Sequence, residues 1–416
     1  MEAIDNILNI DQQPIFNNSI QKENLIKLAP TSGSSLNDDG EINFVIETYD
    51  QYLLPSKSFL YIEGNLTKLD NAALTNADKV TLTNNAPLFL FDSISYSLGG
   101  NIIEKVKDPG RASLMKGILS YSSNLSKQNT FGWILDNSTS TNYKIEKYTD
   151  NMKGKLSFCI PLSHIFGFAE CYNKVIYGAS YSLSLYRNSH KKNDILSTDT
   201  TSFKAKFSIT KINYFYTKIE PSLESEIKLN KIIDTKKSFK IPFLSRQFEE
   251  INVPVATKDF TWQLGVKYDK VKYFIIGFQI KRENNYLNAA VFDHCNLETI
   301  YVELNSERYP HECIICNFTN LNAVQQYIFA KDFKNSYFQT IKDCIFIEET
   351  HYSKYYPLFV IDVSKQNNKI IDSRPDITIQ ANFSKSIPVD TKAYCLVLSE
   401  KCAEISGFGS GFYVKV

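Results

Sequence analysis

Apolar and polar residues alternate with a period of two along several segments of the chain. Residues 93–98 read Ser-Ile-Ser-Tyr-Ser-Leu and then meet Gly99-Gly100, a pair typical of a hairpin turn. Residues 179–185 and 203–210 repeat the pattern, with serine, lysine or threonine at every second position. Such segments have one apolar and one polar face, which indicates antiparallel sheet covering a core on one side.

A second set of strand-like segments begins at residue 239. Its members are 239–248, 260–266, 273–280, 299–304, 344–347, 358–363, 377–383 and 394–398. Helical spacing is confined to a few places, chiefly 112–121 and 320–333. Many short strands in two sets, with few short helices, predict an all-β chain of two tandem jelly-roll (β-sandwich) domains.

The domain boundary is expected at a charged segment between the two sets. Residues 221–234 read PSLESEIKLNKIID, which fits a short helix or a linker. We therefore divide the chain into a polar N-terminal arm (1–40), a first jelly roll (41–222), a linker (223–238) and a second jelly roll (239–416).

Charge and composition exclude several classes of function. The 46 basic and 45 acidic residues give a net charge of +1 without a basic stripe, so direct, sequence-specific nucleic-acid binding is not expected. The N-terminal residues MEAIDNILNIDQQPIF lack the basic flank and unbroken apolar run of a secretory signal, which predicts synthesis without secretion. The eight cysteines have no framework spacing and are interpreted as reduced.

Motifs for catalysis or for cofactors are weak. His311, Cys313 and Cys316 lie close in sequence, but no second Cys-x-x-Cys pair follows, and positions three apart on a strand face opposite sides. The glycine-rich run at 407–412 has no following helix to complete a phosphate site. The five histidines are isolated in sequence. The chain is therefore expected to be no enzyme and to hold no metal or cofactor.

Several segments resemble the double-jelly-roll major capsid proteins of Polinton/Maverick elements and adintoviruses. They are 42–62 (INFVIETYDQYLLPSKSFLYI), 86–111 (APLFLFDSISYSLGGNIIEKVKDPGR), 160–187 (IPLSHIFGFAECYNKVIYGASYSLSLYR) and the paired-strand ending at 374–400. Their order along the chain carries more weight than any one motif. The resemblance implies a non-enzymatic major capsid protein of a DNA virus or virus-derived transposon. Its homotrimers would be pseudo-hexameric capsomers that tile an icosahedral virion, with penton or minor capsid proteins as further partners.

Other functions remain compatible with the same pattern. They are a jelly-roll binding module (lectin-like or a receptor-binding spike), a penton or minor capsid protein, a cupin-like enzyme and a host-domesticated capsid protein. Dispersed histidines argue against the cupin-like site, and two sets of strands argue against a single-jelly-roll penton.

Two segments are candidates for contact between subunits. In the N-terminal arm, Ile4, Ile7 and Leu8 fall on one side of a helical turn, which fits either a short docking helix or a frayed terminus. In the loop at 161–178, His164, Phe166 and Phe168 would favour an interface if exposed. The alternative is that both phenylalanines fill the interior of their own barrel.

Overall fold

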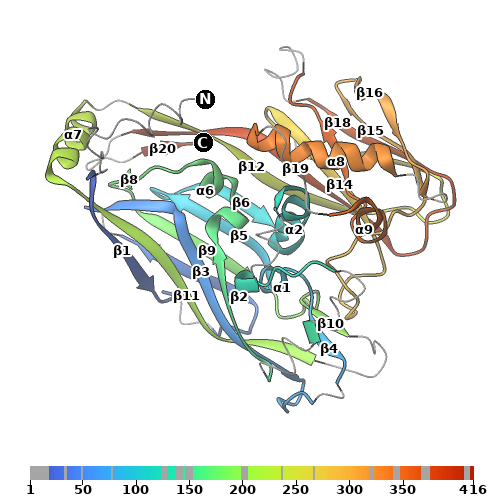
Figure 1. Ribbon diagram of the computed structural model, residues 1–416, viewed down its shortest axis with the longest axis horizontal. Helices are drawn as coiled ribbons and strands as arrows, with labels where there is room; N and C mark the ends of the chain where they lie inside the picture. Colours follow the sequence, from blue (N-terminus) through green and yellow to red (C-terminus); the bar gives the residue numbers. More distant parts are fainter. Residues whose placement is uncertain are drawn as a thin grey trace, which may run out of the picture.

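The computed structural model shows two β-sandwiches, one from each half of the chain, with helix α7 (Leu223–Asp234) between them in sequence (Figure 1). The structure describes residues 18–31, 35–47, 50–75, 78–122, 129–136, 144–145, 153–197, 205–235, 238–265, 268–318, 323–340, 347–366, 375–406 and 413–416. Ile4, Ile7 and Leu8 lie outside these residues, as does the glycine-rich run at 407–412.

The first half forms two antiparallel sheets, ordered β1-β11-β3-β7 and β2-β9-β5-β6. Short β8 pairs with β3, and β4 pairs with β10. The bounds are β1 Ile20–Leu28, β2 Gly40–Ile46, β3 Tyr52–Lys68, β4 Val80–Leu82, β5 Phe91–Leu98, β6 Asn101–Lys107, β7 Lys155–Pro161, β8 Ile176–Tyr177, β9 Tyr181–Arg187, β10 Ile195–Ser197 and β11 Ala205–Pro221.

The second half also forms two antiparallel sheets, ordered β12-β19-β14-β17 and β13-β18-β15-β16, with short β20 beside β19. The bounds are β12 Phe239–Asn252, β13 Asp259–Gln263, β14 Val271–Ile280, β15 Leu297–Leu304, β16 Glu307–Ile315, β17 Phe359–Asp362, β18 Ile377–Phe383, β19 Thr391–Ser406 and β20 Tyr413–Lys415.

Both halves share one connectivity. With the short strands β4, β8, β10 and β20 set aside, each half has one sheet ordered first-eighth-third-sixth and one ordered second-seventh-fourth-fifth. Eight antiparallel strands in two sheets, related by long crossovers, form a jelly roll. The prediction of an all-β chain with two jelly rolls is thus confirmed, and the chain is a structural duplication.

Strand β1 corrects the expected domain division. Residues 20–28 were placed in the polar arm (1–40), yet they form the first strand of the first jelly roll and pair with β11 along their whole length. The strand lies at a sheet edge and most of its residues are exposed, so its sequence, IQKENLIKL, lacks clean alternation. By contrast, β9 is buried at every second residue, as its serine alternation predicts.

In the described ranges the helices are few and short, and most lie in connections between strands. They are α1 (Ala86–Phe89), α2 (Pro109–Ser120), α5 (Leu162–Ile165), α6 (Gly167–Cys171), α7, α8 (Val324–Phe338) and α9 (Glu349–Tyr355), with a 3-10 turn at Asn129–Phe131. The predicted helices at 112–121 and 320–333 correspond to α2 and α8 with shifted ends. Both follow the fifth strand of their jelly roll, so they are equivalent elements of the duplication. None of the helices in the described ranges is long and apolar enough to cross a bilayer.

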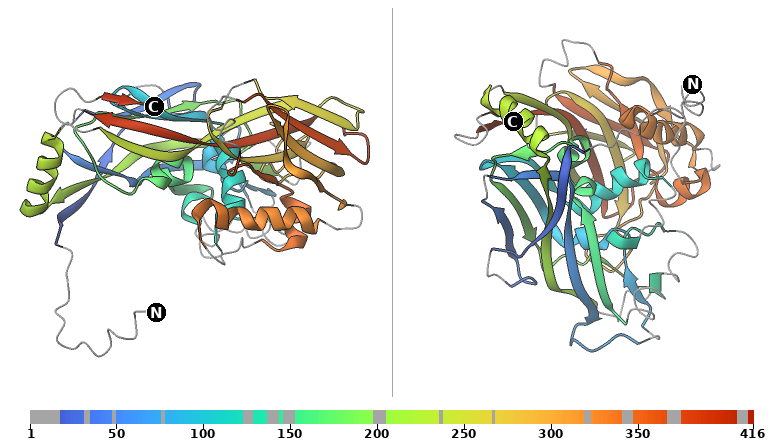
Figure 2. Two further views of the ribbon diagram at one scale, coloured as in Figure 1. Left: turned by 90° about the horizontal axis from the view of Figure 1, so that it is seen from above. Right: turned by 60° about the vertical axis from the view of Figure 1, so that its left-hand side comes forward.

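The β12-β19-β14-β17 sheet is buried on both faces. Phe274, Ile276 and Val397 point into the core of the second jelly roll. On the other face, Tyr273 and Leu396 belong to a core that is continuous with the interior of the first jelly roll. Helices α2 and α8 cover this second face (Figure 2). The two halves therefore share one core and pack as a single unit.

Candidate functional site at the junction of the two jelly rolls

Helix α2 forms the centre of the junction. Its sequence, PGRASLMKGILS, begins after Asp108, whose carboxylate accepts the Arg111 backbone N–H at 3.1 Å, and Pro109 fits the first turn. All residues of α2 are buried. The helix contacts β5 and α1 of its own half, and β12, β19 and α8 of the other half. A helix buried on all sides cannot move without disturbing both cores.

Glu170 on α6 joins both halves through ionic contacts. It accepts hydrogen bonds from Lys116 on α2, from Arg246 Nη2 on β12 at 2.8 Å and from the Tyr337 hydroxyl on α8 at 2.6 Å. The Lys116 and Arg246 side chains are 1% and 0% exposed, and that of Glu170 is 16% exposed. One carboxylate thus pairs with a cation from each jelly roll.

The charges in this cluster stabilise one another. Burial alone would raise the pKa of Glu170, but Lys116 and Arg246 outweigh it and lower that pKa to about 2. Burial lowers the pKa of Lys116 to about 8, although Glu170 opposes the shift. Burial also disfavours the Arg246 guanidinium, yet Glu170 raises its pKa. At neutral pH the three groups are therefore ionised.

Glu104 on β6 ties the same cluster to the backbone. Its carboxylate accepts the N–H groups of Phe168, at 3.0 Å, and of Arg246, at 2.8 Å. Burial raises the pKa of Glu104, against the opposing effect of Arg246. Gly167 lies so close to β12 that an added Cβ would come within 1.7 Å of the Leu244 carbonyl oxygen. The backbones of α6 and β12 are thus in direct contact.

Residues 164–169 of the loop proposed for subunit contact (161–178) lie in this junction and are buried. His164 is 3% exposed, and Phe166 and Phe168 are 0% exposed. The Phe168 ring meets Phe243 of the second half edge-on at 5.4 Å between centroids. These side chains fill their own chain's interior, which corrects the expectation of an exposed contact for His164, Phe166 and Phe168. The physical reason is that β12 covers the loop.

His164 has no free ring nitrogen. Nε2 lies 2.9 Å from Asn85 Oδ1, and Nδ1 hydrogen-bonds the Tyr121 hydroxyl. Burial first, and the nearby Arg246 second, hold its pKa well below the usual range, so the ring is neutral. Because both ring nitrogens of this neutral imidazole are hydrogen-bonded, the ring holds Asn85 and Tyr121 in place and is a poor proton acceptor.

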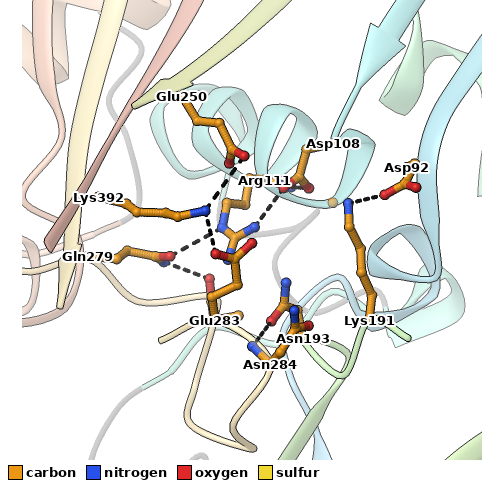
Figure 3. Close-up of polar contacts among 12 residues, drawn as sticks. Asp92, Asp108, Arg111, Lys191, Asn193, Glu250, Gln279, Glu283, Asn284 and Lys392 are labelled. Atoms are coloured by element: carbon orange, nitrogen blue, oxygen red, sulfur yellow. Dashed lines mark hydrogen bonds and ion pairs between the residues drawn. The ribbon is translucent and has the colours of Figure 1, made fainter. Parts of the chain in front are cut away.

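Arg111, which lies on α2 like Lys116 but nearer to the start of the helix, makes a second polar contact between the halves. Figure 3 shows this contact. Arg111 Nη1 donates to Asp108 at 2.6 Å, its Nε donates to Gln279 on β14 at 3.2 Å, and the guanidinium lies 4.7 Å from the Tyr394 ring centroid. Burial opposes ionisation of Asp108, but Arg111 outweighs it and lowers the pKa of that carboxyl. Gln279 in turn donates to two backbone carbonyls of its own half.

Surface loops complete the junction beside Arg111. The Asn284 backbone N–H donates to Asn193 Oδ1 at 2.9 Å, and the Lys192 N–H donates to Asn284 Oδ1 at 3.1 Å. Lys392 pairs with Glu283 and with Glu250, the latter at 3.7 Å (Figure 3). A cleft of about 510 Å³ opens here, and its wall carries both positive and negative side chains.

No group of three or more His, Cys, Asp or Glu side chains in the described ranges could hold a metal ion. Burial raises the pKa of the Cys295, Cys316 and Cys395 thiols, which makes them weak nucleophiles. The junction is suited to a mechanical role, since its charges fix one jelly roll against the other.

Sequence reasoning missed Lys116, Glu170 and Arg246. Lys116 and Glu170 sit inside the apolar runs LMKGIL and FGFAECY, and Arg246 lies in the strand segment PFLSRQF, between two polar residues. A charge within a buried segment needs a partner, and this signal could have singled out the three residues. The pairing itself could not be read from the sequence, because the three lie on α2, α6 and β12.

Comparisons with known proteins agree with this architecture. The chain is similar in structure to the capsid of PBCV-1 virus (TM-score 0.60, 10% identity, 97% of this chain and 99% of that chain covered). It is also similar to a protein of the Sputnik virophage (0.61, 9%, 98% and 91%) and to the mavirus major capsid protein (0.56, 11%, 98% and 92%). No curated protein sequence matches the chain. The family model described as "Double jelly roll-like domain" matches residues 80–403, so the chain belongs to the double jelly roll-like domain family.

Proposed function

We propose that this chain is a major capsid protein whose task is to build a shell. The observation that carries the proposal is the junction: two jelly rolls of the same connectivity are fixed in one orientation by a shared core and buried ion pairs. A shell subunit needs such rigidity, because its outline must be the same in every copy. The likeness in fold to capsid proteins of PBCV-1 and mavirus supports the same function.

The proposal extends to assembly. Three chains would form a homotrimer with six jelly rolls and a pseudo-hexagonal outline, and these capsomers would tile an icosahedral virion together with penton or minor capsid proteins. Because many weak contacts act together in a closed shell, each contact between capsomers can be modest. A virus or virus-derived transposon of the Polinton/Maverick or adintovirus type is the proposed source of such a shell. The role involves no catalytic step.

Native mass tests the proposal. Light scattering on the purified chain should give a stable trimer, three times 47.6 kDa, over a wide range of concentrations. Larger species should form closed shells in negative-stain images. A chain that stays monomeric at high concentration and salt would refute the proposal and favour a jelly-roll binding module.

A further inference from the structure

The two jelly rolls contain equivalent sheets whose outer faces differ in how far they are covered. In the second half, the outer face of β12-β19-β14-β17 is buried beneath α2 and α8. The equivalent sheet of the first half is β1-β11-β3-β7, and in the described part of the chain its outer face carries half-buried Phe59, Tyr61 and Phe215. On β1, Ile26 and Leu28 pack towards the core, so Leu25, which is 54% exposed, faces outward.

This open face has the composition of a protein interface. The Phe59 and Phe215 rings stack at 5.0 Å between centroids, and Tyr61 meets Phe215 edge-on at 6.0 Å. Ion pairs border the aromatic group, with Lys57–Glu23 at 2.8 Å and Lys211–Glu63 at 3.5 Å. An apolar, aromatic centre with a charged rim is typical of surfaces that bind another protein. We call the surface formed by Leu25, Phe59, Tyr61 and Phe215 the β1 face.

The junction within the chain indicates what covers the β1 face. It joins the fifth strand and the following helix of the first jelly roll (β6 and α2) to the first and eighth strands of the second (β12 and β19). Repeating this arrangement between chains would bring β16 and α8 of one copy onto β1 and β11 of the next. The contact between chains would therefore have the same arrangement as the junction that already joins the two jelly rolls within one chain.

The β16–α8 surface also exposes apolar side chains. Ile315 at the end of β16 is 63% exposed, and Val324 and Ile328 on α8 are 44% and 49% exposed. Gln325 and Gln326 hydrogen-bond the backbone of Ile315, which holds the start of α8 beside β16. Val324 and Ile328 lie four residues apart and share one side of the helix.

We infer that the β1 face of one chain binds the β16–α8 surface of a second copy. This inference rests on the proposed function and names the surfaces through which the chain would assemble. In Figure 1, β1 lies on the left of the molecule, and β16 and α8 lie on its right. Because the two surfaces differ, the contact is head-to-tail. A head-to-tail contact closes into a ring when its rotation permits.

Charge substitution at each surface tests the inference on the full chain. Leu25→Glu and Ile315→Glu bury a carboxylate in the contact, and each should lower trimer association about tenfold or more, measured by light scattering over a dilution series. Ile102→Glu is the matched control, since Ile102 is 57% exposed on β6, outside both surfaces, and this variant should remain trimeric. Thermal unfolding of the monomer should be unchanged in all three variants, because each side chain is more than half exposed.

Mixing the two variants tests the direction of the contact. Leu25→Glu retains an intact β16–α8 surface, and Ile315→Glu retains an intact β1 face. The mixture should therefore form a 1:1 pair in native mass spectrometry at a concentration at which neither variant associates alone. Two variants that trimerise like the wild type would overturn the inference and leave the proposed function standing. A mixture that stays monomeric would also overturn it. A wild-type chain that never trimerises would refute the proposed function instead.

Discussion

Replacing Glu170 by Gln should strongly destabilise the chain. The substitution keeps the shape of the side chain but leaves Lys116 and Arg246, at 1% and 0% exposure, without their shared carboxylate. Removing one partner of a buried ion pair costs roughly 3–5 kcal/mol. The pKa gives a consistent figure, because a fall from 4.5 to about 2 corresponds to about 3 kcal/mol. We therefore expect the free energy of unfolding to fall by about 3–5 kcal/mol at pH 7.

Denaturant-induced unfolding followed by tryptophan fluorescence measures this loss. The chain has two tryptophans, and both are buried, Trp133 in the first half and Trp262 in the second. Because the halves share one core, the wild type should unfold in one transition at both sites. Single Trp→Phe variants would separate the two signals.

The pH dependence provides an independent check. The pKa of Glu170 is lowered on folding, so its stabilising effect is complete above about pH 4.5 and is lost as the pH falls towards 2. The difference between wild type and Glu170→Gln should shrink over that range. Glu224→Gln is the matched control: it removes a carboxylate paired with Lys228 on the exposed helix α7 and should leave stability unchanged. Equal stability of Glu170→Gln and wild type at pH 7 would refute this account of the junction.

Two further substitutions test the buried charge and the close packing. Burial raises the pKa of Asp194 from 3.8 to about 7 although Arg187 opposes the shift, so the free energy of unfolding should fall as the pH rises through this range. Asp194→Asn should therefore unfold at a higher denaturant concentration than the wild type at pH 8. An unchanged midpoint would contradict this. Gly167→Ala should lower the free energy of unfolding by about 3 kcal/mol, because the added Cβ meets the Leu244 carbonyl. Gly265→Ala, which has open space around it, should lower it far less. Equal melting temperatures of the two variants by calorimetry would argue against the close contact at Gly167.

Alternation predicted the strands that cover a core on one side. β9 and β18, with their regular inward and outward residues, match the expected segments closely. The predicted strands at 239–248 and 394–398 are parts of the longer β12 and β19. The strand expected at 344–347 begins outside the described residues, and Ile347 is not in a strand.

Two edge strands, β1 and β16, were missed by sequence reasoning, although the edge strands β12, β13 and β17 were expected. β1 and β16 both lie at the edge of a sheet, where few residues are buried, so their sequences carry little hydrophobic pattern. In β16, Pro310 and several charged residues hide the strand further, and proline is tolerated there because an edge strand has unpaired N–H groups. Recognising them requires the partner strand, which only the fold supplies.

The junction was the least predictable part. The phenylalanines of the loop at 161–178 were expected either at an exposed contact or inside the barrel, and sequence alone could not separate these outcomes. The deciding fact is that β12 covers the loop, a contact between residues about 80 positions apart, as in the Arg246–Glu170 pair. Contacts of this range are set by how the two jelly rolls pack.

The most direct test of the account is an image of the assembled particle. Cryo-electron microscopy of the purified chain should give class averages with three-fold symmetry and six lobes of similar size, because each chain would contribute two jelly rolls in fixed relation. Averages with three lobes, or with pairs of lobes in variable orientation, would contradict the claim that the two jelly rolls act as one rigid shell-building unit.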